Sequence, residues 1–143
     1  MTGVEIVVDE NPNHAMRDII VAPLREYNAS QVGPIKPEPL AICLRGDDGA
    51  VIGGLWGHTV ADWLYVDLLI VPDGMRNQGI GTAVMKKAEE IARKRNCVGV
   101  WLCTATFQAP GFYEKLGYSR FGQLPDFPRG HTNFYYSKRL GGC

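Results

Sequence analysis

The sequence lacks the features that would direct a protein to a nucleic acid, a metal ion or a membrane. Its 15 Lys and Arg residues equal its 15 Asp and Glu residues in number, whereas nucleic-acid binding needs a basic excess. Its four cysteines form no C-x-x-C pair and have no histidine at the spacing of metal ligands. The N-terminal residues lack the pattern of a signal peptide, and no apolar run approaches the length of a membrane span. We therefore expect a cytoplasmic protein with reduced thiols, an exposed Cys143, and no metal, nucleic-acid or membrane partner.

The chain does contain enough apolar residues for a sizeable core. Its 143 residues, 45% of them apolar, predict one folded domain spanning residues 1–143. Hydrophobic patterning predicts a mixed α/β (α+β) chain of about seven strands and three or four helices. We expect strands at 4–8, 40–45, 51–58, 63–71, 98–104, 118–123 and 132–138, with "GDDGA" (46–50) as a hairpin turn, and helices at 12–27, 79–96 and 109–117. The inner stripe of the second helix should consist of Ile80, Ala83, Val84, Ala88, Ile91 and Ala92. Pro23 should break or kink the first helix, and residues 28–39 should form a loop or an irregular helix.

The stretch "GMRNQGIGTAVMKKAEE" (74–90) joins an apolar strand to an amphipathic helix. The first N–H groups of a helix have no partner within it, and the aligned peptide dipoles make that end positive. Glycines allow the backbone to approach a ligand closely, and residues 74–88 include Arg76 and two lysines but no acidic residue. The junction therefore predicts an anion site, most naturally for phosphate. The alternative is that the glycines only make a flexible turn.

Two common phosphate motifs do not fit this junction. A Walker loop requires a lysine directly after its last glycine, and none follows Gly81. The dinucleotide fingerprint requires a third small residue where this chain has Val84, and it normally follows an early first strand.

The pattern Arg76-x-x-Gly79-x-Gly81, after a buried strand and at the start of a helix, resembles the acyl-CoA pyrophosphate loop of the GNAT superfamily of N-acetyltransferases. The segment "FYEKLGY" (112–118) is similar to a second element of that family and lies at the expected distance downstream. The resemblance covers about residues 40–140. It implies a mixed, strongly twisted sheet with helices on both faces, in which two central strands separate and hold the pantetheine arm of the cofactor. It also implies direct acetyl transfer from acetyl-CoA to a primary amine of a small molecule or peptide, without an acyl-enzyme.

The resemblance assigns the cofactor contacts mainly to the backbone. Main-chain groups of Leu69, Ile70 and Val71 should pair with the pantetheine arm, while their side chains belong to the core. The pyrophosphate should be held by backbone N–H groups of Arg76, Asn77, Gln78, Gly79, Ile80, Gly81 and Thr82. Many members carry an asparagine where this chain has Thr106, so the polar contact to the pantetheine arm could come from Thr104, Thr106 or Gln108. The alternative for these three residues is capping of the short helix.

Tyr113 and Asp67 are the candidate catalytic residues. Tyr113 matches the family's frequent general acid, and a phenol with a pKa of about 10 is protonated at neutral pH. It could instead pack in the core with its hydroxyl bound to the backbone. Asp67 should share a strand face with Tyr65 and Leu69 in a run expected to be buried, where a carboxylate without a partner is costly. It could act as the base, directly or through water, or it could be a structural carboxylate.

The acceptor site is less well defined. The resemblance places it near residues 27–39 and 124–131, with mixed charge from Asp126, Arg129 and His131 and apolar walls from Tyr27, Phe127 and Trp56. Because no acidic cluster is visible, a small amine is favoured over a polycationic acceptor. The alternative to an enzyme is a non-catalytic module that senses acyl-CoA. A homodimer is common for the fold, and the sequence does not decide this point.

Overall fold

The computed structural model describes residues 3–141, so Cys143 and its predicted exposure lie outside the described residues. The chain consists of two units, with the boundary between Ile35 and Lys36. Each unit is described by itself below.

The N-terminal unit contains one helix, α1 (His14–Val32). The side chain of Asn13 caps it by accepting a hydrogen bond from the Met16 N–H at 2.9 Å, and Gly33 ends it with a positive φ of 84°. Pro23 lies inside the helix without ending it, so the prediction of a loop or irregular helix after residue 27 is wrong up to Val32. The strand predicted at 4–8 is also wrong, because these residues form neither a strand nor a helix and belong to none of the strands of the sheet.

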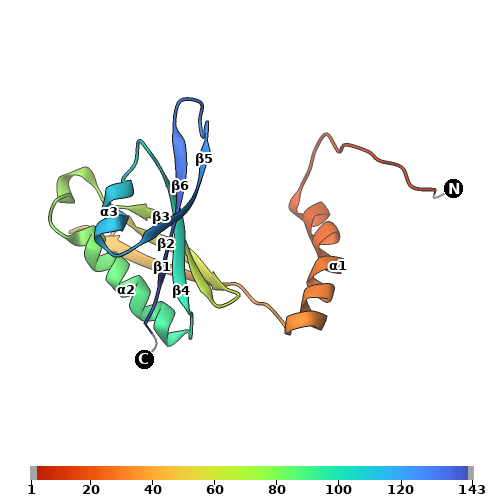
Figure 1. Ribbon diagram of the computed structural model, residues 1–143, viewed down its shortest axis with the longest axis horizontal. Helices are drawn as coiled ribbons and strands as arrows, with labels where there is room; N and C mark the ends of the chain where they lie inside the picture. The colour runs from red at the N-terminus through yellow and green to blue at the C-terminus, as the bar shows by residue number, and fades with distance from the viewer. Residues whose placement is uncertain (1–2, 142–143) are drawn as a thin grey trace. The chain divides into compact units, whose positions relative to one another are not determined.

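The second unit is built on one sheet of six strands, rather than the seven expected (Figure 1). Its strands are β1 (Glu38–Arg45), β2 (Val51–Val60), β3 (Trp63–Ile70), β4 (Gly99–Ala105), β5 (Ser119–Pro125) and β6 (Thr132–Arg139). Their order is β1-β2-β3-β4-β6-β5, and β3–β4 is the parallel pair in an otherwise antiparallel sheet. The predicted "GDDGA" turn joins β1 to β2, where the Gly46 N–H donates to the Ala50 carbonyl at 2.9 Å. The expected mixed sheet is therefore confirmed.

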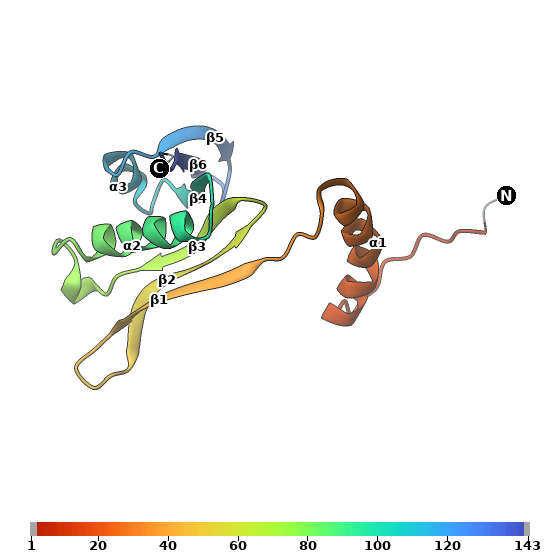
Figure 2. The same cartoon turned by 90° about the horizontal axis from the view of Figure 1, so that it is seen from below.

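Two helices pack on one face of this sheet. They are α2 (Ile80–Lys94) and the short α3 (Pro110–Lys115), and Figure 2 shows α2 running across β2 and β3. A 3-10 turn, η1 (Asp73–Met75), connects β3 to α2. The stripe predicted for α2 is buried at Val84, Ala88 and Ala92 and partly buried at Ile80 and Ile91, but it is wrong at Ala83, which is exposed. Met85 and Glu89 are buried in addition. These helices cover a core that includes Leu64, Val66, Val100, Leu102 and Tyr136 from the strands, and Tyr113 and Tyr118 from around α3.

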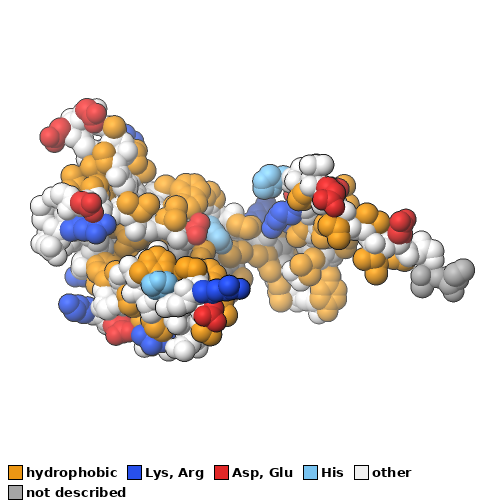
Figure 3. Space-filling view, turned by 90° about the horizontal axis from the view of Figure 1, so that it is seen from above, with side chains coloured by type: hydrophobic (Ala, Val, Ile, Leu, Met, Phe, Trp, Pro, Cys, Tyr) orange, Lys and Arg blue, Asp and Glu red, His pale blue; other side chains and the backbone are white. Residues whose placement is uncertain are grey.

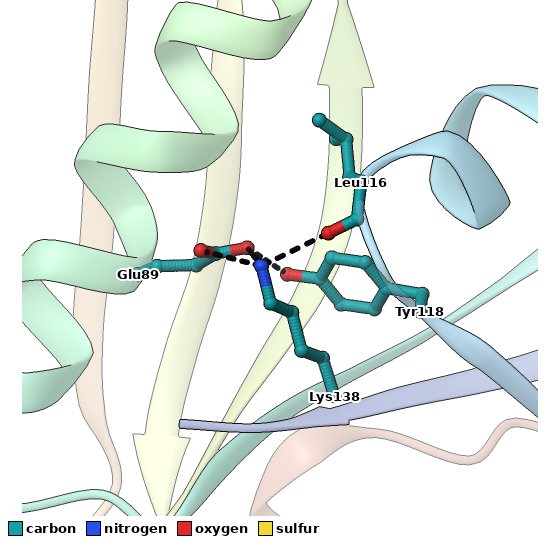
Figure 4. Close-up of polar contacts among 4 residues, drawn as sticks. All are labelled: Glu89, Leu116, Tyr118 and Lys138. Atoms are coloured by element: carbon teal, nitrogen blue, oxygen red, sulfur yellow. Dashed lines mark hydrogen bonds and ion pairs between the residues drawn. The ribbon is translucent and has the colours of Figure 1, made fainter. Parts of the chain in front are cut away.

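A buried polar network fixes α2 against the end of α3 and against β6 (Figure 4). The Glu89 carboxylate, on a residue only 6% exposed, accepts hydrogen bonds from the Tyr118 hydroxyl at 2.8 Å and from the Lys138 ammonium at 3.1 and 3.2 Å. The same ammonium donates to the Leu116 carbonyl at 2.9 Å. Burial and the neighbouring carboxylate raise the pKa of Tyr118, so its hydroxyl remains a donor. The network thereby holds α2 in place, and the first turn of α2 directly follows the loop predicted to bind phosphate.

The surface carries no strong charge of one sign on the side that Figure 3 draws, where acidic and basic side chains are scattered among apolar ones. This agrees with the balanced composition. Among residues 3–141, no helix is long and apolar enough to cross a membrane. No three His, Cys, Asp or Glu side chains in this range are grouped as metal ligands would be.

Candidate active site

The two central parallel strands run together for only part of their length. β3 pairs with β4 from Trp63 opposite Gly99 to Val66 opposite Leu102, and the pairing stops there. Beyond that point β3 continues alongside β2 to Ile70, while β4 continues alongside β6 to Ala105. The main chain of β3 from Asp67 onward therefore has an edge without a strand partner on the β4 side, within the part of the chain that the structure describes.

A β-bulge in β3 lies at the point of separation. On β2, the consecutive residues Trp56 and Gly57 face Leu68 and Val66, so Asp67 is an extra residue on β3. The bulge shifts the alternation of side chains: Leu69 packs against the core, whereas Leu68 and Ile70 are 50% and 55% exposed. The predictions that Asp67 shares a face with Leu69 and that Ile70 is a core side chain are therefore wrong.

Asp67 itself is exposed rather than buried, so its carboxylate carries no large desolvation cost. It lines a cavity together with Tyr65, which does lie on the expected side. The bulge thus presents the carboxylate at the surface next to the unpaired edge of β3.

The loop before α2 offers a row of free backbone donors. Asn77 and Gly79 adopt positive φ angles of 65° and 74°, and the helix begins at Ile80. From Asn77 to Thr82 no backbone N–H donates to another residue of the described chain, and the first bond of the helix runs from the Ala83 N–H to the Gly79 carbonyl at 3.0 Å. Successive free N–H groups in such a turn form a concave anion site. The residues present therefore fit a phosphate group.

Arg76 stands at the edge of this loop. Its guanidinium contacts Asp73 at 3.1 Å, and both side chains are largely exposed, so this ion pair is weak and can be exchanged for another anion. Gly81 serves a different purpose from Gly79: a Cβ there would lie 3.1 Å from Cζ of Phe112, so the missing side chain lets α3 approach the start of α2.

Tyr113 lies on α3 beside this junction, and its residue is only 8% exposed. Among residues 3–141, no group hydrogen-bonds its hydroxyl, so the alternative of a hydroxyl bound to the backbone is not what the structure contains. Burial, with a smaller effect of the nearby Cys103 thiol, raises the pKa of Tyr113 to about 12. The phenol is therefore fully protonated at neutral pH and has its proton available to donate.

Gln108 and Thr106 have different roles in the turn after β4. The Gln108 side-chain oxygen accepts hydrogen bonds from the Ala105 N–H at 2.7 Å and from the Thr104 hydroxyl at 3.2 Å. Thr106 holds the β5–β6 hairpin, since its hydroxyl lies 3.3 Å from His131 Nδ1 and accepts from the Thr132 N–H at 3.4 Å. No side chain caps α3, so the capping alternative is wrong for Thr104, Thr106 and Gln108.

A cavity of about 500 Å³ opens beside the separated strands. It is lined by Tyr65, Asp67, Cys103, Ala105, Phe107, Gln108, Asp126, Phe127, Pro128 and Asn133. Of the acceptor residues expected from the sequence, Asp126 and Phe127 line it, whereas Arg129, His131 and Trp56 do not. Asn133 was missed, because nothing in the sequence distinguishes it from the other polar residues of β6.

Cys103 links the cavity to Tyr113. Its thiol lies 4.0 Å from the Tyr65 hydroxyl, and it is near enough to raise the pKa of Tyr113 as well. Burial and the same thiol raise the pKa of Tyr65 to about 12. The cavity, the unpaired edge of β3 and the Tyr113 phenol are thus parts of one region.

Comparison with known proteins agrees with this geometry. Residues 6–118 match the model of the acetyltransferase (GNAT) family. Acetyltransferase Atu2258 of Agrobacterium fabrum is 41% identical over 134 residues, which is 94% of this chain and 95% of that protein. Blasticidin-S acetyltransferase of Streptomyces morookaense is 38% identical over 118 residues, or 82% of this chain and 85% of that protein.

Solved structures support the same assignment. A crystal structure of an acetyltransferase from Bacillus cereus superposes with a TM-score of 0.82 at 29% identity, covering 94% of this chain and 98% of that one. Family model, relatives and fold thus give the same assignment. The chain belongs to the GNAT acetyltransferase family and is an acyltransferase that moves an acetyl group to an amine.

Proposed function

We propose that this protein transfers the acetyl group of acetyl-CoA to a primary amine of a small molecule. The observation that carries the proposal is the separation of β3 from β4 next to six consecutive free backbone N–H groups, Asn77 to Thr82. A strand edge that lacks a partner can hydrogen-bond an extended pantetheine arm, and the N–H row suits the pyrophosphate. Acetyl-CoA supplies an activated thioester, so the protein needs only to orient the reactants and move protons.

Each residue then has a defined task. The backbone of Leu69, Ile70 and Val71 holds the pantetheine arm, and an N–H near Leu69 stabilises the negative charge that develops on the carbonyl oxygen. Asp67, exposed at the bulge, takes the proton that the attacking amine loses, directly or through water. Tyr113 donates its proton to the departing thiolate, which its free hydroxyl supports. Gln108, which follows β4, contacts the pantetheine arm through its side-chain amide nitrogen. Of the two polar atoms of this side chain, only the oxygen is already hydrogen-bonded within the described residues, to Thr104 and Ala105.

One relative favours a small-molecule amine over a peptide as the acceptor. Blasticidin-S acetyltransferase, whose acceptor is the small molecule blasticidin S, is 38% identical and matches 82% of this chain. A cavity of about 500 Å³ also falls within the range of pockets that hold small molecules. The alternative of a sensor that binds acyl-CoA without turnover is less well supported, because it gives no use to the unbound phenol of Tyr113.

Two measurements test this proposal. Isothermal titration should detect binding of acetyl-CoA and CoA but not of NADH, and the Gly79→Val variant should bind both weakly, because a β-branched residue does not adopt a φ of 74° without strain. Release of free CoA thiol should then be followed across a panel of small amines and short peptides. Acetyl-CoA binding without thiol release for any amine would favour the sensor, and absence of binding would refute the proposal.

A further inference from the structure

The cavity beside β3 and β4 carries an excess of negative charge in a protein whose charges are otherwise balanced. Of its ten lining residues, two are carboxylates, Asp67 and Asp126, and none is Lys, Arg or His. Neither carboxylate makes an ion pair or hydrogen bond with any residue from 3 to 141. The two come from distant parts of the chain, so the sequence alone does not show that they line one cavity.

Asn133 is a second, independent indication of a ligand. Its residue is 4% exposed, it lines the same cavity, and its carboxamide makes no hydrogen bond within the described chain. Within the described residues no fully buried side-chain nitrogen or oxygen lacks a partner, so the unbonded atoms of this carboxamide are open to the cavity. A polar group of a bound molecule would satisfy this carboxamide.

The walls of the cavity are held in place by hydrogen bonds. The Phe127 N–H donates to the His131 carbonyl at 3.0 Å, and the His131 N–H donates to the Pro128 carbonyl at 2.9 Å, which closes the β5–β6 turn on itself. The Thr106 N–H donates to the Thr132 carbonyl at 2.9 Å and joins that turn to the end of β4. Asp126, at the start of the turn, is therefore presented from a fixed loop.

The two carboxylates have different partners in an acetylation reaction. The acceptor nitrogen must be neutral when it attacks, so the carboxylate next to it, Asp67 at the bulge, gains a proton rather than a lasting ion pair. Asp126 lies in the turn between β5 and β6, and it receives no proton during the transfer. A carboxylate that keeps its charge in a cavity is best satisfied by a cation that also keeps its charge.

We propose, on the basis of the acetyltransferase function above, that the acceptor is a small molecule with a second cationic group, and that Asp126 binds this group while Asp67 faces the reacting amine. Asn133 hydrogen-bonds a polar group of the same molecule, and Phe107 and Phe127 contact its apolar part. The inference concerns substrate class.

The test compares two compounds that differ only in the second charge, p-xylylenediamine and 4-(hydroxymethyl)benzylamine. Binding to the protein saturated with CoA is measured by isothermal titration, so that the readout does not require turnover. The diamine should bind about tenfold more tightly, as expected for a charge-assisted hydrogen bond, and added salt should reduce the ratio. In Asp126→Asn the ratio should fall to about one, because asparagine keeps the shape and tolerates the φ of 58° at this position.

Asp47→Asn is the matched control, since this exposed carboxylate of the β1–β2 turn lies outside the cavity, and its ratio should equal that of the unmodified protein. Equal binding of the two compounds, or an unchanged ratio in Asp126→Asn, would overturn the inference. If the two compounds are acetylated with equal kcat/KM, the proposed function stands and the inference fails. If neither acetyl-CoA nor CoA binds, the proposed function itself fails.

Discussion

Two tyrosines of the segment "FYEKLGY" (112–118), Tyr113 and Tyr118, should separate catalysis from stability when each loses its hydroxyl. Tyr113 and Tyr118 are both buried, at 8% and 3% exposure, and their rings are 6.0 Å apart. They differ in hydrogen bonding: the Tyr118 hydroxyl donates to Glu89 at 2.8 Å, whereas the Tyr113 hydroxyl has no partner within residues 3–141. Replacement by phenylalanine removes only that one oxygen in each case, so the two variants are matched.

The expected magnitudes follow from these contacts. Tyr118→Phe removes a hydrogen bond to a buried carboxylate and should lower the free energy of unfolding by about 1.5–3 kcal/mol. Tyr113→Phe removes a hydroxyl that has no protein partner, so the free energy of unfolding should change by less than about 1 kcal/mol. If Tyr113 protonates the leaving thiolate, its loss should reduce kcat by about 10²–10⁴-fold and leave the Kd for acetyl-CoA nearly unchanged.

The assay pairs urea unfolding with release of CoA thiol at saturating acetyl-CoA and amine. Tyr113→Phe should be stable but slow, and Tyr118→Phe should be less stable but active while folded. A kcat of Tyr113→Phe close to that of the unmodified protein would refute the role of Tyr113 as the acid, provided that chemistry limits turnover. A Tyr113→Phe variant as destabilised as Tyr118→Phe would show that the hydroxyl has a structural partner.

Three further predictions concern the core and the cavity. Lys138→Met should lower the free energy of unfolding by about 3–5 kcal/mol in urea titrations, because Glu89 keeps a buried charge, and adding Glu89→Leu should restore most of the loss. Alkaline titration should lower the free energy of unfolding from pH 10 upward, because the pKa of Tyr113 is raised from 10 to about 12 on folding. Its stabilisation is complete below pH 10 and about 2 kcal/mol of it is lost by pH 12, so Tyr113→Phe should lose less stability over this range. Cys103→Ala should keep most of kcat in the thiol-release assay, since direct transfer uses no acyl-enzyme, and an inactive but folded variant would contradict this.

The elements that could be predicted from the sequence are those whose signals are local. The "GDDGA" turn, the amphipathic period of α2 and the glycines of the loop at 74–81 each depend on neighbouring residues, and the structure has them close to the expected places. The run at 4–8 has the local composition of a strand, but it belongs to none of the strands of the sheet. Glu89 was absent from the predicted stripe because its burial depends on Lys138, which is remote in sequence.

The candidate site could be predicted only in part for the same reason. The free N–H groups before α2 follow from a helix start preceded by glycine, which the sequence shows directly. The acceptor cavity depends instead on the sheet order, in which β6 lies next to β4, so that Asp67 and Asp126 line the same space. No periodicity within either segment carries that information, so the sequence indicated mixed charge where the folded protein has two carboxylates.

The bulge at Asp67 was also beyond local prediction, because it is defined by the register between β2 and β3. If the bulge is what turns β3 away from β4, then deleting Asp67 should close the gap without disturbing the core. Leu68 would then follow Val66 directly, and the pairs Leu68–Trp56 and Leu69–Leu55 would keep their faces.

This deletion therefore separates the bend from the carboxylate. The variant lacking Asp67 should fold, with cooperative urea unfolding, but should bind acetyl-CoA at least about tenfold more weakly, because the edge of β3 is then free to pair with β4. Asp67→Ala keeps the extra residue and should bind acetyl-CoA normally while losing turnover, if the carboxylate is the base. Normal acetyl-CoA affinity in the folded deletion variant would mean that the strands separate for another reason, such as the Gln108 side chain held at the end of β4.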